Sequence, residues 1–488
     1  MSILAPDGWL NDAITHLNDF LWTYILIGTL IGCGIWFTIR TRFVQFRMVG
    51  EMVRLLADST VKNVGQKHIS SFQAFAVSVA TRVGTGNLAG VATAIAIGGP
   101  GAVFWMWMIA LIGSATAFVE STLAQLFKVR HKDSFIGGPA YYIQRGMHNR
   151  WMAVVFAILL TITFGLSYNS IQSNTICHAM NEAFGWNRTI TGLFLVALSL
   201  VVVFGGIHRI AKVSSVIVPV MAIGYFILAA VIVIMNIHLL PHVFKTIIAN
   251  AFGIEQVAGG GLGVTMMNGI KRGLFSNEAG EGSAPNVAAT ASVSHPVKQG
   301  LIQALGVFTD TLLVCSCTAF IILISGLYTT PGLNGIALTQ SALQSEVGAA
   351  GPTFIAVAIF LFAFSSIIGN YYYGEANIRF LLAKKEKEGK SYVLFIYRLC
   401  SGGVMVLFGA LASLEIVWNL GDVCMALLTA CNLIAIITLG KYAFRLLDDY
   451  RTQKRQGIKE PTFHGSQIPE IEKDLDAWGE VSVQSSEF

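Results

Sequence analysis

Apolar runs recur along almost the whole chain and are separated by short polar connections. A transmembrane helix needs about 20 mostly apolar residues, and eleven segments reach or approach that length, the seventh being only weakly apolar. They lie near 20–39, 71–97, 101–127, 151–177, 189–206, 213–236, 256–275, 299–326, 353–381, 392–412 and 416–440. This pattern predicts an all-α polytopic membrane protein with eleven transmembrane helices.

Glycine interrupts two of these segments. The second contains Gly84–Asn87 (Gly-Thr-Gly-Asn), and the seventh contains the glycine-rich run Gly259–Gly263. Gly in a helix interior costs about 1 kcal/mol relative to Ala, and unwound backbone is tolerated in a membrane only where protein or a cavity surrounds it. Interrupted helices at corresponding positions of two halves are typical of secondary transporters built from repeats.

Setting aside the first segment leaves ten, which divide into two sets of five. We therefore expect a five-plus-five inverted repeat preceded by one extra N-terminal helix, because two sets with an odd number of spans insert with opposite topology. The loop after the first helix is amphipathic and either lies on the inner membrane surface or is a plain connector. The expected parts are an extracytoplasmic N-terminus (1–19), the extra helix (20–39), a cytoplasmic amphipathic loop (40–70), the two repeats (71–236 and 255–440) and a mostly flexible cytoplasmic tail (441–488).

Basic residues fall almost entirely on one side of the predicted membrane. Of the 32 Lys and Arg residues, all but three lie in the connections on the side of the C-terminus or in the tail. The exceptions are Arg188 and Lys245, on the opposite side, and Arg82, inside a span. The positive-inside rule then places the N-terminus outside and the C-terminus in the cytoplasm of a plasma membrane, which in a bacterium is the inner membrane.

Composition narrows the function classes. The chain is 54% hydrophobic and 12% charged, against about 25% charged in soluble domains, and its net charge of +5 reflects loop bias and not a nucleic-acid partner. The seven cysteines lie in apolar segments without metal-ligand spacing, which favours a packing role. Phosphate-loop, hydrolase and potassium-filter motifs are missing, so the sequence predicts neither an ATP-driven pump nor an enzyme.

Polar residues within the spans are candidate site residues. Ser366 and Asn370 share a helix face, and the hydroxyls of Ser365 and Ser366 suit a small hard cation, although such serines also bond back to the preceding turn. Gln172 lies in a polar cluster, and the residues alone do not separate it from Asn169. Buried charge is costly, so the ionisable residues in or near spans are further candidates: Arg82, Glu120, Asp310, Glu375, Glu415 and Asp422.

Two motifs are explained equally well by a purely structural role. Gly86 and Gly90 fit a small-xxx-small helix contact as well as a binding site. The polar run Ser276–Asn286 is either an inner gate or a connector on the cytoplasmic side.

Three stretches resemble the alanine/glycine:cation symporter family. They are Thr81–Met108, which includes Gly84–Asn87, then Phe275–Gly280 and Phe362–Glu375. The resemblance extends over Leu21–Tyr442 and implies a leucine-transporter-type fold. It also implies sodium-coupled uptake of small neutral amino acids, usually alanine or glycine, by alternating access, with sodium as co-transported ion, a lipid bilayer around the protein and no other cofactor.

The resemblance also implies roles for individual residues. The amides of Thr85 and Gly86 would hold the substrate carboxylate, with Asn87 beside it or beside a second cation. Carbonyls of Ala80 and Val83 and the hydroxyls of Ser365 and Ser366 would bind sodium. Gln172 matches a glutamine of the third core helix. Met267 and Gly269 would lie in the unwound seventh segment and, with Ser366 and Asn370, complete the substrate site.

The chain departs from the family pattern at one wall of this site. The family often has Thr-Thr and Trp where this sequence has Ser365-Ser366 and Asn370. The hydroxyls are kept, but an indole is replaced by a smaller amide. Because buried polar groups discriminate strongly between substrates, the change predicts a larger or more polar substrate than alanine, for example glutamine.

Two alternatives to sodium symport stay open at this level. One is a proton-coupled amino-acid carrier on the same fold, which would depend on Asp310 or Glu375. The other is an amino-acid sensor or channel-like protein, which saturable transport would exclude. The sequence leaves the oligomeric state undetermined.

Overall fold

The computed structural model describes residues 9–61, 69–131, 134–205, 207–253, 261–382 and 392–479. Almost all of this is helix, as the apolar pattern predicts. In the described part, the strands are β1 (Val129–His131) and β2 (Ser134–Ile136), which pair as a short antiparallel hairpin.

The N-terminal helix is longer than expected. α1 (Trp9–Phe20), η1 (Leu21–Leu26) and α2 (Ile27–Arg40) follow one another without a break, so the helix begins 11 residues before the segment predicted from apolarity alone. Two short helices follow in the amphipathic loop, α3 (Val44–Arg47) and α4 (Val49–Val61). In α4, Met52 and Leu55 are buried while Val53 is exposed, which confirms amphipathic helix. Its position on a membrane surface stays a prediction.

The first predicted repeat begins with a broken helix. Its elements are α5 (Ser71–Arg82), η2 (Gly86–Gly90), α6 (Val91–Gly98), α7 (Ala102–Leu126), α8 (Pro139–Gly146), α9 (Arg150–Ile162), η3 (Thr163–Tyr168), α10 (Asn169–Phe184), α11 (Arg188–Gly205) and α12 (Ile207–Met235). η4 (Ile237–Leu239) and α13 (Leu240–Ala251) follow, bent by 75° from the end of α12.

The second predicted repeat also begins with a broken helix. Its elements are α14 (Leu262–Asn277), α15 (Ala284–Ala288), α16 (Val297–Val307), η5 (Phe308–Cys315), α17 (Ser316–Ser325), η6 (Leu327–Thr329), α18 (Gly335–Val347), α19 (Ala350–Leu382), α20 (Tyr392–Leu399), η7 (Cys400–Val404), α21 (Met405–Leu411) and α22 (Leu414–Arg455).

The described residues of the eleven predicted segments are almost entirely helical, with α14 covering the seventh segment from Leu262 onward. Within the described residues, seven helices are long and apolar enough to cross a membrane, or eight if the bent pair before and after Asn236 forms one span. A polytopic membrane protein is therefore confirmed. The eleven-span inverted repeat stays a prediction, because several segments are short or broken.

Helices α8, α13, α15 and α18 lie between the predicted spans and were not anticipated. α18 packs against the broken second segment and against α10: Thr339 Oγ1 donates to the carbonyl of Leu88 over 3.0 Å, and Gln340 Nε2 donates to that of Ala179 over 3.0 Å. A search for apolar runs does not detect α18, because its composition is mixed. α18 covers η2 through these contacts.

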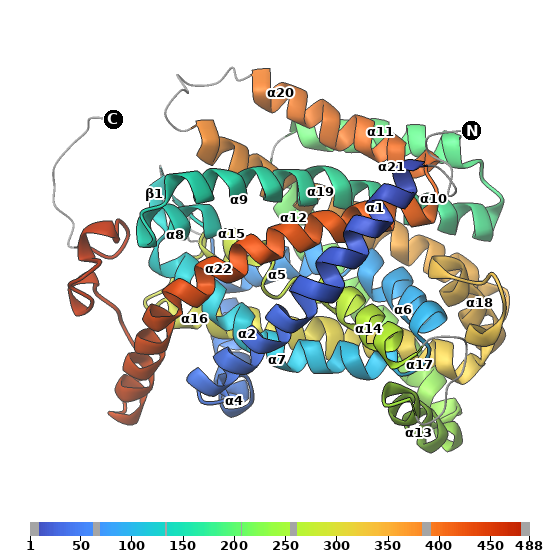
Figure 1. Cartoon of the computed structure of the whole chain (residues 1–488), viewed down its shortest axis with the longest axis horizontal. Coiled ribbons are helices and arrows are strands. Elements are labelled where there is room, and N and C mark those ends of the chain that lie inside the picture. Colours follow the sequence, from blue (N-terminus) through green and yellow to red (C-terminus); the bar gives the residue numbers. More distant parts are fainter. Residues whose placement is uncertain are drawn as a thin grey trace.

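The C-terminal tail is folded up to Gly479, so the prediction of a mostly flexible extension is wrong for the described part (Figure 1). α22 continues to Arg455, and η8 (Gly465–Gln467) and η9 (Glu472–Asp474) follow. Phe463 and Leu475 are buried. Trp478 Nε1 donates to the carbonyl of Gln125 at the end of α7 over 2.9 Å. Scattered apolar residues fix this segment although its composition is polar.

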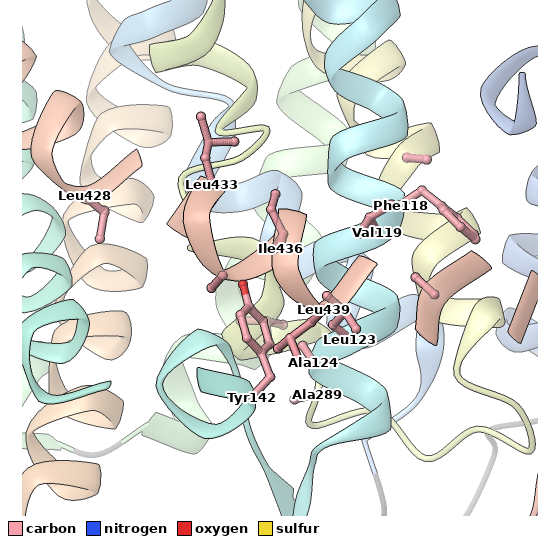
Figure 2. Packing of buried hydrophobic residues seen from close by; sticks show 14 of the residues in the cluster. Phe118, Val119, Leu123, Ala124, Tyr142, Ala289, Leu428, Leu433, Ile436 and Leu439 are labelled. Atoms are coloured by element: carbon pink, nitrogen blue, oxygen red, sulfur yellow. The ribbon is translucent and has the colours of Figure 1, made fainter. Parts of the chain in front are cut away.

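The core at this end of the molecule is built around Tyr142 of α8 (Figure 2). In this view Leu439 of α22 and Leu123 of α7 lie close to its ring, whereas Leu433 points away from it, and all are buried. The hydroxyl of Tyr142 donates to the side chain of Asn432. Packing against α22 thus holds α8, which lies in the connection after α7, on the helix bundle.

Candidate functional site

The first helix break lies where the glycines predict it. α5 ends at Arg82, Val83 is extended (φ −74°, ψ 100°), and η2 begins at Gly86. All residues from Val83 to Asn87 are buried. The amide of Gly84 donates to Asn87 Oδ1 over 2.9 Å, so the side chain of Asn87 stabilises the break. A Cβ on Gly84 would lie 2.6 Å from Ser366 Oγ, which explains why glycine is needed there.

Gln172 of α10 reaches this break. Its Oε1 accepts from Thr85 Oγ1 over 2.7 Å and from the amide of Thr85 over 3.3 Å. Asn169, the other candidate site residue of this polar cluster, instead donates to Ser401 Oγ over 2.9 Å. Among the hydrogen bonds of the described residues, Gln172 therefore bonds to the break and Asn169 bonds to η7.

The side chain of Asn87 connects the break to two further helices. Its Nδ2 donates to Asp310 Oδ1 over 2.7 Å and to Ser276 Oγ over 3.0 Å. Ser276 Oγ also donates to Asp310 Oδ2 over 2.6 Å. All three side chains are buried. They form a closed polar cluster that holds one carboxylate next to Gly84.

The serine pair of α19 lies against the end of α5. Oγ of Ser365 and Oγ of Ser366 are each 3.3 Å from the carbonyl oxygen of Ala80. Both hydroxyls are also within 3.1 Å of the carbonyl of Phe362, the back-bonding geometry of serines in helices. The two hydroxyls and the Ala80 carbonyl therefore meet here, with the Thr81 carbonyl 3.2 Å from Ser366 Oγ, and oxygens are the hard ligands that small cations prefer.

The glycine run of the seventh segment lies partly outside the described residues, so a helix break there stays a prediction. α14 begins after Gly261 and is continuous through Met267 and Gly269, while 254–260 lies outside the described residues. The expectation that Met267 and Gly269 lie in unwound backbone is therefore wrong. A Cβ on Gly269 would lie 2.4 Å from the carbonyl oxygen of Ala102, so this glycine permits close packing of α14 on α7.

The observed break is Glu278–Ser283, between α14 and α15. Glu278, Gly280 and Gly282 have positive φ values of 57°, 96° and 81°, and the carboxylate-bearing residues Glu278 and Glu281 are buried. The run Ser276–Asn286, which the sequence predicts to be either an inner gate or a connector, therefore contains a buried break. The two breaks meet, because Ser276 bonds to Asn87.

Acidic and amide side chains from other helices stabilise this second break. Glu120 Oε1 accepts from the amide of Gly280 over 3.2 Å, and Asn432 Nδ2 donates to both Glu120 Oε2 and the carbonyl of Gly280 over 2.9 Å. Tyr168 donates to Glu281 over 3.1 Å. Unwound backbone buried in a membrane protein needs such partners, which assigns Glu120 and Asn432 a structural role.

An aromatic and ionic cluster covers the first break from the side of α22. A Cβ on Gly86 would lie 3.1 Å from the ring of Phe275, whose centroid is 4.8 Å from that of Trp418. Arg272 of α14 lies 4.3 Å above the Trp418 ring and forms a buried ion pair with Asp422 of α22. Arg272 therefore lies in the interior of the helix bundle. The count of basic residues on each side of the membrane places it in a connecting loop, which is wrong.

Two other predicted residues have less direct roles. Asn370 is buried, and its Nδ2 has no hydrogen-bond partner among the described residues. Glu375 bonds to Arg379 over 2.6 Å and lies 3.6 Å from Arg398, an ion-pair cluster at one end of α19. The ion pairs of Glu375 favour a structural role for this residue over a role in proton transfer.

The family model and three relatives that match this chain are described as amino-acid symporters or carriers. The family model described as the sodium:alanine symporter family matches residues 7–465. The chain is 53% identical over 457 residues to the probable sodium/glutamine symporter GlnT of Bacillus subtilis, with 93% of each chain covered. It is 42% identical to the putative sodium/proton-dependent alanine carrier protein YrbD of that organism, covering 98% of this chain and 99% of the relative. It is 35% identical to the sodium/alanine symporter AgcS of Methanococcus maripaludis, covering 87% and 94%.

Proposed function

Because the chain belongs to the sodium:alanine symporter family, we propose that it carries a small neutral amino acid into the cell together with sodium by alternating access. The observation that carries the proposal is the meeting of Ser365 and Ser366 with the Ala80 carbonyl at a helix break. Such a break offers free carbonyls to a cation and free amides to a carboxylate.

The substrate carboxylate binds at the start of η2 in this proposal. The amides of Thr85 and Gly86 lie there, at the positive end of the half-helix dipole. The carboxylate takes the place of Gln172 Oε1 at the amide of Thr85, and Gln172 then becomes free to bond to the substrate. Phe275 covers Gly86 and excludes water from the bound amino acid.

Sodium binds between α5 and α19. The carbonyls of Ala80 and Val83 and the hydroxyls of Ser365 and Ser366 are its ligands. At a membrane potential of 100 mV, each sodium ion that enters supplies about 2.3 kcal/mol, enough to drive substantial accumulation. Bound sodium holds α5 to α19 beside the substrate amides, which couples the two binding free energies.

Arg272, Asp422, Trp418 and Phe275 form the outer gate in this mechanism. The positive-inside rule places the ends of α2 and α7 and the C-terminal tail in the cytoplasm, so the ion pair between α14 and α22 lies on the outer side of the breaks. Substrate entry requires this pair to separate. Its burial makes the closed gate water-tight.

Glutamine is our first choice of substrate. The most polar change from the family pattern is Asn370, whose buried Nδ2 has no hydrogen-bond partner among the described residues, and a relative with 53% identity carries glutamine in its name. The side-chain oxygen of glutamine is an acceptor to which this Nδ2 can donate. Alanine and glycine bind without using it.

Proton coupling is the second candidate, for one reason. Asp310 is a buried carboxylate bonded to Asn87 itself, so its charge state affects the site directly. The Asn87–Ser276–Asp310 cluster is also the place for a second cation in this proposal, since Ser276 Oγ lies 2.6 Å from one carboxylate oxygen of Asp310 and both side chains are buried.

Transport in proteoliposomes tests the proposal. Purified protein is given labelled glutamine, alanine, glycine and serine, with an inward sodium gradient, an inward proton gradient or neither. Sodium-driven, saturable uptake is expected, with glutamine preferred. Uptake driven by protons alone would replace sodium coupling with the second candidate, and no accumulation under any gradient would exclude a carrier.

A further inference from the structure

The extra N-terminal helix carries a stripe of polar and aromatic residues that the transport mechanism leaves unused. Asn11, Thr15, Asn18 and Trp22 recur every three or four residues and so share one face of the helix from α1 to η1. Asn18 is 3% exposed and Trp22 0%, whereas Leu17 and Phe20 on the other face are about half exposed. Polar side chains of a membrane helix face protein partners.

The first partner of this stripe is α22 (Figure 1). Asn419 Nδ2 donates to Thr15 Oγ1 over 2.9 Å and to Asn11 Oδ1 over 3.3 Å. Asn18 Nδ2 donates to Asn419 Oδ1 over 3.3 Å. One turn further along, Trp22 Nε1 donates to the carbonyl of Asp422 over 3.1 Å.

The second partner is α14. Lys271 Nζ donates to Asn18 Oδ1 over 3.2 Å and lies 5.4 Å from the centre of the Trp22 ring. Lys271 is 5% exposed, so its charge is buried against these two groups. Asn18 and Trp22 therefore each contact both α14 and α22.

These contacts surround the outer gate. Lys271 precedes Arg272 in α14, and Trp22 bonds to the backbone of Asp422, while Arg272 and Asp422 form the buried ion pair between the same two helices. Separating α14 from α22 breaks the ion pair and also removes Asn18 and Trp22 from one of their partners. The N-terminal helix is thus joined to both moving sides of the gate.

We propose that the stripe of Asn11, Thr15, Asn18 and Trp22 is a clamp that holds α14 against α22 and sets the balance between closed and outward-open states. Asn18 and Trp22 are positioning residues, since they act through Lys271 and Asp422 and do not touch the site at Thr85. The proposal rests on the transport function proposed above. It assigns a conformational role to the helix that lies outside the two predicted repeats.

Two conservative variants of the full-length protein test the clamp. Asn18→Leu removes the polar contacts at similar volume, and Trp22→Phe removes the N–H group while keeping a ring near Lys271. Leu17→Ala, on the exposed face of the same helix, is the matched control. The readouts are hydrogen exchange of the peptides covering α14 and 414–424 in nanodiscs, and the KM and kcat of sodium-driven uptake in proteoliposomes.

A clamp predicts a specific combination of changes. Loosening it populates the outward-open state, so KM for external substrate and kcat both fall, because the apparent affinity follows the population of the binding-competent state and closure becomes harder. Exchange in both peptides rises about five-fold, the change expected for one lost hydrogen bond. The control leaves both readouts at wild-type values.

Other outcomes overturn the clamp. A merely structural role would lower the yield of folded protein or kcat with KM and exchange unchanged in the folded fraction. If wild-type protein shows no driven uptake, the proposed function fails, and the exchange experiment still decides the clamp by itself. Exchange that stays at the wild-type level in both variants rejects it.

Discussion

Asn87 and Asp310 are 223 residues apart in the chain, yet Asn87 Nδ2 donates to Asp310 Oδ1 over 2.7 Å. This bond joins the break after α5 to η5, and Ser276, at the end of α14, bonds to both side chains. A polar connection of this kind allows a ligand at one break to affect the other. We expect Asp310→Asn to uncouple sodium binding from substrate binding, which titrations of each ligand in the presence of the other would measure as a coupling factor near one.

The close approach of Gly84 to Ser366 makes substitution there harmful. An Ala Cβ at position 84 would lie 2.6 Å from Ser366 Oγ and 3.2 Å from Gln172 Oε1, and such overpacking costs about 1–3 kcal/mol. Gly84→Ala should therefore abolish sodium-driven uptake. In the matched control, Gly90→Ala, the nearest atom is 3.5 Å away, and uptake should stay near that of the wild type. Equal uptake by the two variants would contradict the geometry.

The serine hydroxyls should control sodium affinity. We expect Ser365→Ala and Ser366→Ala each to raise the sodium concentration for half-maximal uptake about ten-fold, equivalent to about 1.4 kcal/mol. Sodium should also protect the wild type against heat more than it protects either variant, because a ligand stabilises the state that it binds. Ser345→Ala in α18, which removes a hydroxyl bonded to Ala342, is the control. Unchanged sodium dependence in both site variants would exclude this site.

Asn370 should set substrate preference. Asn370→Trp restores the residue typical of the family and removes the unpaired amide, so the ratio of glutamine to alanine uptake should fall about ten-fold or more. Alanine uptake by the same variant serves as its internal control for folding. A substrate ranking identical to that of the wild type would show that this wall does not contact the substrate side chain.

The attachment of α4 to the end of α22 should depend on pH. Glu51 Oε1 accepts from Tyr450 over 2.6 Å, and Arg54 donates to both of its oxygens over 2.7–2.8 Å. Burial alone raises the pKa of Glu51, but the hydrogen bonds from Arg54 and Tyr450 lower it to about 2. Because the folded-state pKa lies below the ordinary 4.5, the stabilisation is complete above that pH and is lost as the pH falls toward 2.

Hydrogen exchange in α4, measured between pH 5 and 2.5 and corrected for the intrinsic rate, is the appropriate observable. Protection should decline with pH in the wild type and should be low and independent of pH in Glu51→Gln. Glu472→Gln, an exposed change in the tail, should behave like the wild type. A decline in Glu51→Gln as steep as that of the wild type would assign the pH dependence to another group.

The folded tail should resist proteolysis. Trp478 donates to Gln125, lies 4.8 Å from Lys128 Nζ and packs on Phe463 with 5.3 Å between ring centroids. Trp478→Ala should increase tryptic cleavage at Lys459 and Lys473 about ten-fold, the effect of about 1.4 kcal/mol on local opening. Ile458→Ala, at an exposed position, should leave cleavage unchanged. Rapid cleavage in the wild type itself would mean that the tail is not docked.

Local sequence was sufficient to identify the membrane class, the apolar helices and the first break, and its motifs identified the family. These properties follow from local composition: apolar length fixes a span, and Gly84-Thr85-Gly86 cannot continue a helix cheaply. The pairing of Ser365 with Ala80 was predicted only through the family resemblance, because nothing local indicates which helix faces α5.

Tertiary structure alone decided where the second break falls. The sequence left open whether the polar run Ser276–Asn286 is a gate or a connector, whereas in the fold α14 continues to Asn277 and the chain unwinds at Glu278–Ser283. There, Glu120 and Asn432 from distant helices satisfy the exposed amide and carbonyl of Gly280. Glycine makes unwinding possible, whereas buried unwound backbone is stable only where other helices supply hydrogen-bond partners. The docked tail and the stripe on α1 depend on partners far along the chain for the same reason.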